Sequence, residues 1–185
     1  MRAEELIVLV DRDGTPTGTA EKRAAHHADT PLHLAFSCYV FDDAGRVLAT
    51  RRSDGKPVWP GVWTNTVCGH PAPGEGFGAA IGRRLDHELG MAADDVEVVL
   101  DHYIYRAPPC RGIVEHELCP VFVARARGAP HANPDEVADH RWMRWEDFVR
   151  VARADTGGAW SWWCKDQLRT AAGRIGAYAA RPPVP

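Results

Sequence analysis

Hydrophobic side chains recur every four residues in one part of the chain, between positions 77 and 89. This spacing places them on one face of an α-helix, and it predicts a helix over residues 75–89. Gly90 follows directly, at a position where glycine commonly ends a helix. The apolar stripe of this predicted helix consists of Phe77, Ile81, Leu85 and Leu89.

Elsewhere, runs of apolar and aromatic residues lie between clusters of Gly, Pro and Asp, a pattern typical of strands joined by turns. The segment DDAG between two such runs predicts a hairpin. A short helix capped by Thr19 is expected at 20–25. Residues 11–18 predict a turn, and the tail from about residue 178 predicts an irregular end. The predicted strands are residues 6–10, 33–41, 46–52, 95–105, 112–125 and 140–145, and the later helices are residues 146–154 and 161–175.

The mixture of a hairpin with alternating strands and helices predicts a fold of the α/β (α+β) class. A hairpin requires antiparallel neighbours, whereas strands joined through helices are commonly parallel. We therefore expect a mixed β-sheet sandwiched between α-helices. The chain has 185 residues, no internal repeat and no segment typical of a linker, which predicts a single domain over residues 1–185.

The net charge is −3 with neutral histidines, so the chain as a whole does not strongly attract nucleic acid or an anionic membrane. No apolar run reaches the ~20 residues that cross a bilayer, and residues 6–10 are typical of a strand rather than a signal peptide. Five cysteines, with no Cys-x-x-Cys pair, argue against a disulfide framework. We expect a cytoplasmic monomer that binds a small molecule, neither nucleic acid nor membrane.

Two glutamates lie in the apolar segment GIVEHELCPVF, residues 112–122. In a strand, Glu115 and Glu117 point to the same side, with Cα atoms about 7 Å apart. Apolar residues on both sides of this strand predict burial, and buried carboxylates without partners are strongly destabilising when ionised. A bound metal ion or a strongly raised pKa would relieve this cost. The alternative is an edge strand whose glutamates are solvated.

Histidines supply further candidate ligands. The loop TNTVCGHP places Cys68 two residues before His70, and the segment AAHHADTPLHL contains three more histidines. With Glu115 and Glu117 they form a mixed nitrogen and oxygen set, which suits Mn²⁺, Fe²⁺ or Zn²⁺ better than Mg²⁺ or Ca²⁺. Spacing alone leaves open scattered histidines that are satisfied separately. The three histidines are His26, His27 and His33.

Residues 69–91, GHPAPGEGFGAAIGRRLDHELGM, resemble the Nudix box G-x5-E-x7-R-E-U-x-E-E-x-G-U, in which U is aliphatic. Arg84 and His87 replace two of its glutamates. Pyrophosphate hydrolases use the clustered glutamates to hold several Mg²⁺ ions, which neutralise phosphate charge and activate water. The replacements therefore argue against hydrolysis, while the fold is retained. The matching positions are Gly69, Glu75, Arg83, Leu85, Glu88, Gly90 and Met91.

Taken together, the segments from about Leu6 to about Leu168 resemble the type I isopentenyl-diphosphate isomerases, a family with the Nudix fold. The resemblance implies conversion of isopentenyl diphosphate to dimethylallyl diphosphate in isoprenoid precursor biosynthesis. In that reaction the terminal alkene carbon gains a proton and C2 loses one, through an intermediate resembling a tertiary carbocation. The motifs that carry the resemblance are HLAF, TRR, WPGVWTN, VCGHP, HELG, YRA, GIVE and CPVF.

The resemblance also implies two metal ions. One Mn²⁺ or Zn²⁺ would be held by three histidines and two glutamates, and one Mg²⁺ would bind at Glu88 together with the substrate diphosphate. His27 falls outside the family pattern. The ligands of the first ion would be His26, His33, His70, Glu115 and Glu117.

The implied catalytic groups are Cys68 and Glu117, which would transfer the two protons, with Tyr105 hydrogen-bonded to the glutamate. Trp163 would cover the pocket, and its indole face would stabilise the cation by on the order of 2 kcal/mol. Trp162 is the alternative for this role. The residues implied to face the diphosphate are Lys22, Arg52 and Lys56, with Arg51 beside them.

One position departs from the family, which has Glu-Asn-Glu where this chain has His116 between its two glutamates. The middle residue of a strand triplet points to the opposite face, so we do not expect His116 to bind the metal. Two other functions stay open: a Nudix hydrolase that releases phosphate, and a module that binds a diphosphate without turnover. The lost box glutamates argue against the first, and the presence of Cys68, Glu117 and Tyr105 argues against the second.

Overall fold

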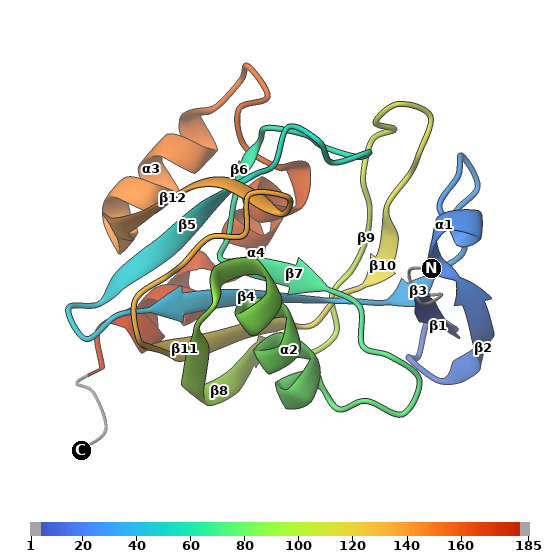
Figure 1. Cartoon of the computed structure of the whole chain (residues 1–185), viewed down its shortest axis with the longest axis horizontal. Helices are drawn as coiled ribbons and strands as arrows, with labels where there is room; N and C mark the ends of the chain where they lie inside the picture. Colours follow the sequence, from blue (N-terminus) through green and yellow to red (C-terminus); the bar gives the residue numbers. More distant parts are fainter. Residues whose placement is uncertain (1–4, 182–185) are drawn as a thin grey trace.

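The computed structural model describes residues 5–181, whose strands form two sheets (Figure 1). The five-stranded sheet, at the right of Figure 1, consists in spatial order of β2 (Pro16–Glu21), β1 (Leu6–Val10), β3 (His33–Leu34), β10 (His116–Leu118) and β9 (Ile104–Arg106). The seven-stranded sheet consists of β12 (Val137–Arg144), β5 (Arg46–Arg52), β4 (Phe36–Phe41), β11 (Val121–Arg127) and β8 (Ala92–Leu100), with β6 (Trp63–Thr64) paired to β5 and β7 (Val67–Gly69) paired to β4.

Helices cover both faces of the seven-stranded sheet. One face packs against α2 (Phe77–Leu89), and the other packs against α3 (Trp145–Ala154) and α4 (Trp162–Ala179). Successive residues of β4 point alternately into the two apolar clusters, as expected for a strand buried on both sides. A mixed sheet between helices was predicted from the sequence, and the structure confirms it.

The sequence predicted three long segments as single strands, and this prediction is wrong in one respect: each segment is divided between the two sheets. In the last of them the break falls at Pro120, which has no N–H to continue a ladder of hydrogen bonds. The local apolar pattern runs through each break without interruption, so it does not reveal the division. The segments are residues 33–41 (β3 and β4), 95–105 (β8 and β9) and 112–125 (β10 and β11).

The parallel pairing of β3 with β10 continues in the same register as the pairing of β4 with β11. His33 lies beside Glu117 in the smaller sheet, and Ser37 lies beside Val121 in the larger one. Backbone hydrogen bonds bridge the gap between the two sheets along this pair of chain segments. The register therefore places a histidine directly next to a glutamate at the junction of the sheets.

Other boundaries also differ from the prediction. Residues 16–21 form an edge strand, where the sequence predicted a turn up to residue 18 and a helix from residue 20. A proline is tolerated at the start of such an edge strand. The short helix α1 (Lys22–Ala25) is capped by the carboxylate of Glu21 and not by Thr19. Helix α4 continues to Ala179, beyond the predicted irregular start of the tail, and residues 182–185 lie outside the described part of the chain.

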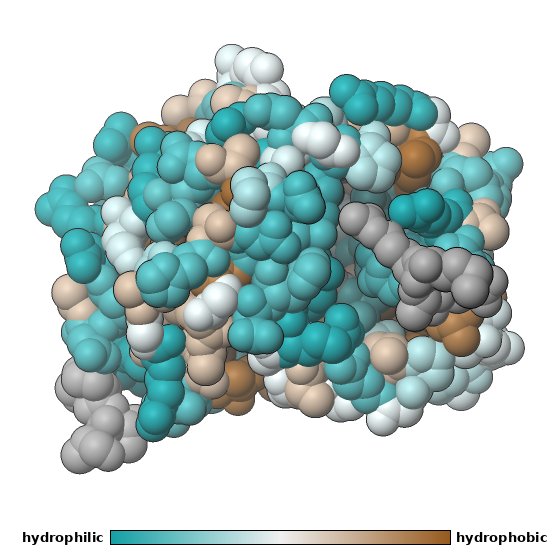
Figure 2. Space-filling model, viewed as in Figure 1, coloured by the Kyte–Doolittle hydropathy of each residue, from teal (hydrophilic) through white to brown (hydrophobic). Residues whose placement is uncertain are grey.

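The face shown in Figure 2 is mostly hydrophilic, with hydrophobic residues scattered over it. Within residues 5–181, the exposed large hydrophobic side chains are Leu6, Val96 and Val98. No helix in that part of the chain combines the length and apolar character needed to cross a membrane. All five cysteines are free, in agreement with the sequence.

Candidate metal centre and active site

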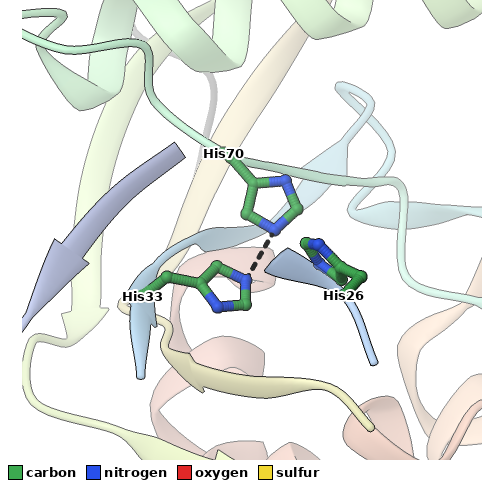
Figure 3. Close-up of side chains that lie close together, drawn as sticks. All are labelled: His26, His33 and His70. Atoms are coloured by element: carbon green, nitrogen blue, oxygen red, sulfur yellow. Dashed lines mark hydrogen bonds between the residues drawn. The ribbon is translucent and has the colours of Figure 1, made fainter. Parts of the chain in front are cut away.

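Three histidine rings from separate segments converge beside the five-stranded sheet (Figure 3). His26 ends α1, His33 is the first residue of β3, and His70 follows β7. The Nε2 atoms of His33 and His70 lie 3.1 Å apart. One ligand atom from each of the three rings lies within 4.8 Å of the others, which is close enough to share one metal ion.

Two carboxylates complete this group. Glu117 lies in β10, with Oε1 3.3 Å from Nε2 of His70 and 3.8 Å from Nε2 of His33. Glu115 precedes the same strand, and its Oε2 is 3.4 Å from Nε2 of His26. All five residues that the sequence suggested as ligands are therefore near neighbours, and together they form a His/Glu group able to hold a metal ion.

Backbone carbonyls orient two of the rings for metal binding. Nδ1 of His26 is 2.6 Å from the carbonyl oxygen of Lys22, and Nδ1 of His33 is 2.9 Å from that of Pro31. A carbonyl only accepts, so each Nδ1 carries a proton, and each ring in its neutral form would present an Nε2 lone pair to the centre. This arrangement, with nitrogen and carboxylate donors, fits a divalent transition metal.

Burial lowers the pKa of His33 and, more strongly, that of His70, which keeps both imidazoles neutral. At His26 burial opposes the charged form, but the hydrogen bond and charge of Glu115 outweigh it and raise the pKa. Neutral imidazole is the form that binds a metal ion. Burial thus favours the metal-binding form at His33 and His70, whereas at His26 a metal ion would have to displace the proton that Glu115 stabilises.

The remaining histidines of these segments lie outside the group. His27 accepts a hydrogen bond at Nδ1 from the backbone N–H of Asp29, at 3.1 Å. Nδ1 of His116 is 3.2 Å from the carbonyl oxygen of Thr30. His116, the residue that departs from the family pattern, therefore supports the segment between His26 and His33 instead of reaching the centre.

The second carboxylate oxygen of Glu117 points to Tyr105. The two residues are directly paired between β10 and β9, and the tyrosine hydroxyl donates to Oε2 at 2.6 Å. Burial raises the pKa of Tyr105 well above its usual value, so its hydroxyl stays protonated and acts as a donor. Glu117 is thus held on one side by a phenol while its other oxygen faces the imidazoles.

Cys68 lies in β7, directly opposite Ser37 of β4. Its Sγ is 3.3 Å from Oγ of Ser37 and 3.3 Å from Oδ1 of Asn65. Burial raises the pKa of the Cys68 thiol to about 11, and the charge of Glu117 also contributes to the increase. Sequence reasoning missed both partners, although Asn65 stands in the same WPGVWTN motif that contributed to the family resemblance.

Two tryptophans border this region. Trp163 is 5% exposed, and its ring lies edge-on to Trp59 at a centroid distance of 5.8 Å. The guanidinium of Arg52 lies 5.8 Å from the centroid of Trp163. Trp162 instead packs against Tyr105, with centroids 5.7 Å apart. The two indoles therefore have different neighbours, and substitutions can test them separately.

A small cavity connects Cys68 with a group of charged side chains, and its lining includes Arg52, Glu88 and Glu136. Arg84 donates to Glu88 at 2.5 Å and to Glu136 at 3.0 Å. Burial raises the pKa of Glu88, against the opposing charge of Arg84. Arg84 replaces a box glutamate, so a position that would bind metal in a hydrolase here carries a cation between two carboxylates.

Sequence reasoning also missed Glu136, which lies in the turn-rich segment before β12 and offers no distinctive local signal. Lys56 forms an ion pair with it. The other predicted diphosphate-binding cations have separate partners: Arg52 donates to the carbonyl oxygens of Val58 and Trp59 at 3.0 Å each, Arg51 pairs with Asp54, and Lys22 pairs with Glu5.

We expect Glu136→Gln to reduce the free energy of unfolding at pH 7 by on the order of 2 kcal/mol, allowing for partial solvent screening. Burial alone would raise the pKa of Glu136, but Lys56 and Arg84 outweigh it and lower the pKa to about 2. A carboxyl group whose pKa is lower in the folded protein than in the unfolded chain, where it is about 4.5, stabilises the fold at pH values above 4.5. This contribution declines as the pH falls toward 2.

Denaturant titrations between pH 7 and pH 3 measure this effect. The wild-type protein should lose stability below about pH 4.5 more steeply than Glu136→Gln. The exposed neighbour offers a matched control, Asp135→Asn, which should follow the wild-type curve. Parallel curves for wild type and Glu136→Gln would contradict the prediction.

Comparison with known proteins adds independent information. A family model described as NUDIX domain matches residues 31–162. The isopentenyl-diphosphate Delta-isomerase of Mycolicibacterium vanbaalenii is 54% identical over 164 residues, which covers 89% of this chain and 90% of the relative. Those of Paenarthrobacter aurescens and Salmonella arizonae are 57% and 51% identical, and the alignments cover 77% and 86% of this chain and 78% and 87% of the relatives.

Solved structures agree on the architecture. A protein from Deinococcus radiodurans superposes with a TM-score of 0.67 at 18% identity, over 90% of this chain and 99% of its own. A MutT NUDIX hydrolase from Burkholderia pseudomallei superposes with a TM-score of 0.56 at 20% identity, over 75% of this chain and 96% of its own. At this level of identity the likeness shows the fold alone, which is the one predicted from the sequence.

Proposed function

Because the chain belongs to the isopentenyl-diphosphate Delta-isomerase family of Nudix-fold proteins, we propose that it converts isopentenyl diphosphate to dimethylallyl diphosphate. One structural observation supports this more than any other: Glu117 belongs to a compact His/Glu group, accepts a 2.6 Å hydrogen bond from Tyr105, and its charge acts on the thiol of Cys68. Arg84 occupies a box position that a hydrolase needs for metal binding, and its ion pairs with Glu88 and Glu136 oppose hydrolysis.

The isomerisation adds a proton to the terminal alkene carbon and removes one from C2, so substrate and product contain the same number of protons and carry the same charge. Two acid–base groups must therefore flank the carbon chain. We assign these roles to Cys68 and Glu117. Tyr105 holds Glu117 through its 2.6 Å hydrogen bond and restricts the direction of the carboxylate.

The His/Glu group is proposed to bind one Mn²⁺ or Zn²⁺ through His26, His33, His70, Glu115 and Glu117. When bound, this ion would supply positive charge that orders the two carboxylates and lowers the proton affinity of Glu117. The neutral state of the buried imidazoles and the two Nδ1–carbonyl contacts support the assignment.

The diphosphate is proposed to lie at the charged end of the cavity, where Glu88 would bind Mg²⁺ together with phosphate oxygens, and Mg²⁺ would neutralise part of the phosphate charge. A diphosphate held there acts as a remote handle that positions the alkene between the acid–base groups. Positive side chains on several segments would contribute to this binding. The proposed ones are Lys22, Arg51, Arg52 and Lys56.

Trp163→Leu is expected to lower kcat about 30-fold, because removing the indole face removes on the order of 2 kcal/mol of cation stabilisation. Trp163→Phe keeps an aromatic face and should lose less. Trp162→Leu is the matched comparison, and it should retain most of the activity. Steady-state kinetics with purified variants of equal Tm measure the effect; a larger loss at Trp162 would transfer the role to that residue.

The proposed function is tested by incubating the pure protein with isopentenyl diphosphate, Mg²⁺ and Mn²⁺ while dimethylallyl diphosphate and free phosphate are followed together. We expect dimethylallyl diphosphate without phosphate. Phosphate without the isomer would identify a hydrolase, and binding without either product would identify a non-catalytic module. Both of those results would overturn the proposal.

A further inference from the structure

We propose that Gln167 and Ser37 are positioning residues that fix the orientation of the Cys68 thiol, an inference that rests on the catalytic role proposed above for Cys68. Gln167 lies in α4, which covers the face of the sheet that carries Ser37 and Cys68. These residues come from three separate elements, and a chain of hydrogen bonds joins them.

The hydrogen bonds in this chain have a defined direction. The hydroxyl of Tyr39 donates to Oε1 of Gln167 at 2.9 Å, so the amide nitrogen of the glutamine faces Ser37 and donates to its Oγ at 2.8 Å. Because Ser37 accepts this bond, its own proton is free to be donated to a sulfur. Sγ of Cys68 lies 3.3 Å away, and Sγ of Cys119 lies 3.5 Å away.

Asn65 contacts the thiol from another side. Its amide nitrogen donates to the carbonyl oxygens of Cys38 and Val67 at 3.1 Å each, which turns Oδ1 toward Sγ of Cys68 at 3.3 Å. The thiol therefore lies between a hydroxyl that donates to sulfur and an amide oxygen that accepts from it. These two contacts favour one direction of the S–H bond and one rotamer of the side chain.

The apolar surroundings indicate that this polar chain serves more than packing. Ser37, Tyr39 and Gln167 are 0% exposed, within a cluster of hydrophobic side chains between the sheet and helices α3 and α4. Buried polar groups are tolerated only when hydrogen-bonded, and apolar residues of similar shape would pack such a core equally well. The polar chain ends at the thiol, so a catalytic position benefits from the direction it imposes.

The test compares Gln167→Met with Leu168→Met. Both residues lie in α4 and are 0% exposed, and both changes preserve side-chain volume. Gln167→Met should lower kcat about 10- to 100-fold with KM for isopentenyl diphosphate within about twofold, because a misdirected thiol affects proton transfer more than binding. Leu168→Met should keep the wild-type kcat. The Tm of each variant is measured alongside.

Ser37→Ala and the double variant Ser37→Ala/Gln167→Met extend the comparison. Both changes interrupt one chain of hydrogen bonds, so the double variant should be no slower than the slower single variant. Three results would each overturn the inference. The first is a double variant whose loss of kcat is the product of the two single losses, and the second is a wild-type kcat in Gln167→Met. The third is an equal loss of kcat in Gln167→Met and Leu168→Met that follows their Tm.

Cys68→Ala separates this inference from the proposed function. If Cys68→Ala is inactive while Gln167→Met and Ser37→Ala keep the wild-type kcat, only the positioning role fails. If Cys68→Ala keeps near-normal turnover, the catalytic assignment of Cys68 fails, and the positioning role fails with it.

Discussion

Cys68→Ala is expected to lower kcat for isopentenyl diphosphate by about a thousandfold, with a much smaller change in KM. The substitution removes one of the two proposed acid–base groups, while the charged end of the cavity that would bind the diphosphate is unchanged. A positioned acid or base commonly contributes factors of about 100 to 10,000, so the loss should far exceed that of any packing change. Steady-state rates of dimethylallyl diphosphate formation measure it.

Cys38→Ala provides the matched control, since it removes a thiol from the neighbouring strand. Cys38 points into the cluster against α2, on the opposite face of the sheet from α4. We expect this variant to lose some stability through a small cavity but to keep its kcat. If Cys68→Ala retained more than about a tenth of the wild-type kcat, the assignment of a proton-transfer role to Cys68 would be refuted.

Removing metal with a chelator is expected to abolish isomerisation and to lower Tm by on the order of 10 °C. A ligand present at about a thousand times its Kd stabilises a protein by about 4 kcal/mol, and each kcal/mol shifts Tm by about 2–4 °C at this chain length. The physical reason lies in the His/Glu group, where the metal ion would neutralise the negative charge of two carboxylates held close together in a partly buried site.

Two adjacent histidines give a matched pair for this experiment. His26 belongs to the group of converging rings, whereas His27 bonds the local backbone. In His27→Ala the chelator should still lower Tm, and Mn²⁺ or Zn²⁺ should restore both Tm and activity. In His26→Ala the chelator should lower Tm by a much smaller amount. Equal chelator effects in the two variants would show that the metal binds elsewhere.

Local elements were largely predictable from the sequence because they depend on neighbours a few residues apart. The stripe of α2 repeats every four residues, and Gly90 ends that helix in a left-handed conformation, with φ 55°. Strands β1 and β5 have the predicted bounds. The candidate ligands and acid–base residues were also named from motifs, although their catalytic roles stay predictions.

Only the tertiary structure decided how those candidates meet. An apolar run does not specify its partner or its register, and a register shift of one residue would turn every side chain to the other face. The observed register puts His33 beside Glu117 and Ser37 opposite Cys68. The tertiary structure also divides three long apolar segments between two sheets, and the His/Glu group forms where these sheets meet.

The least predictable contacts join residues far apart in the chain. Arg84 meets Glu136 across 52 positions, and Gln167 meets Ser37 across 130. Neither Glu136 nor Gln167 stands in a distinctive motif, and each meets its partner only because packing brings distant segments together. The sequence by itself predicted the longer helices, several strands and the residues proposed to carry the chemistry, because these depend on local patterns and motifs. The register of the strands and the docking of α4 decided which side chains surround the thiol and the cavity.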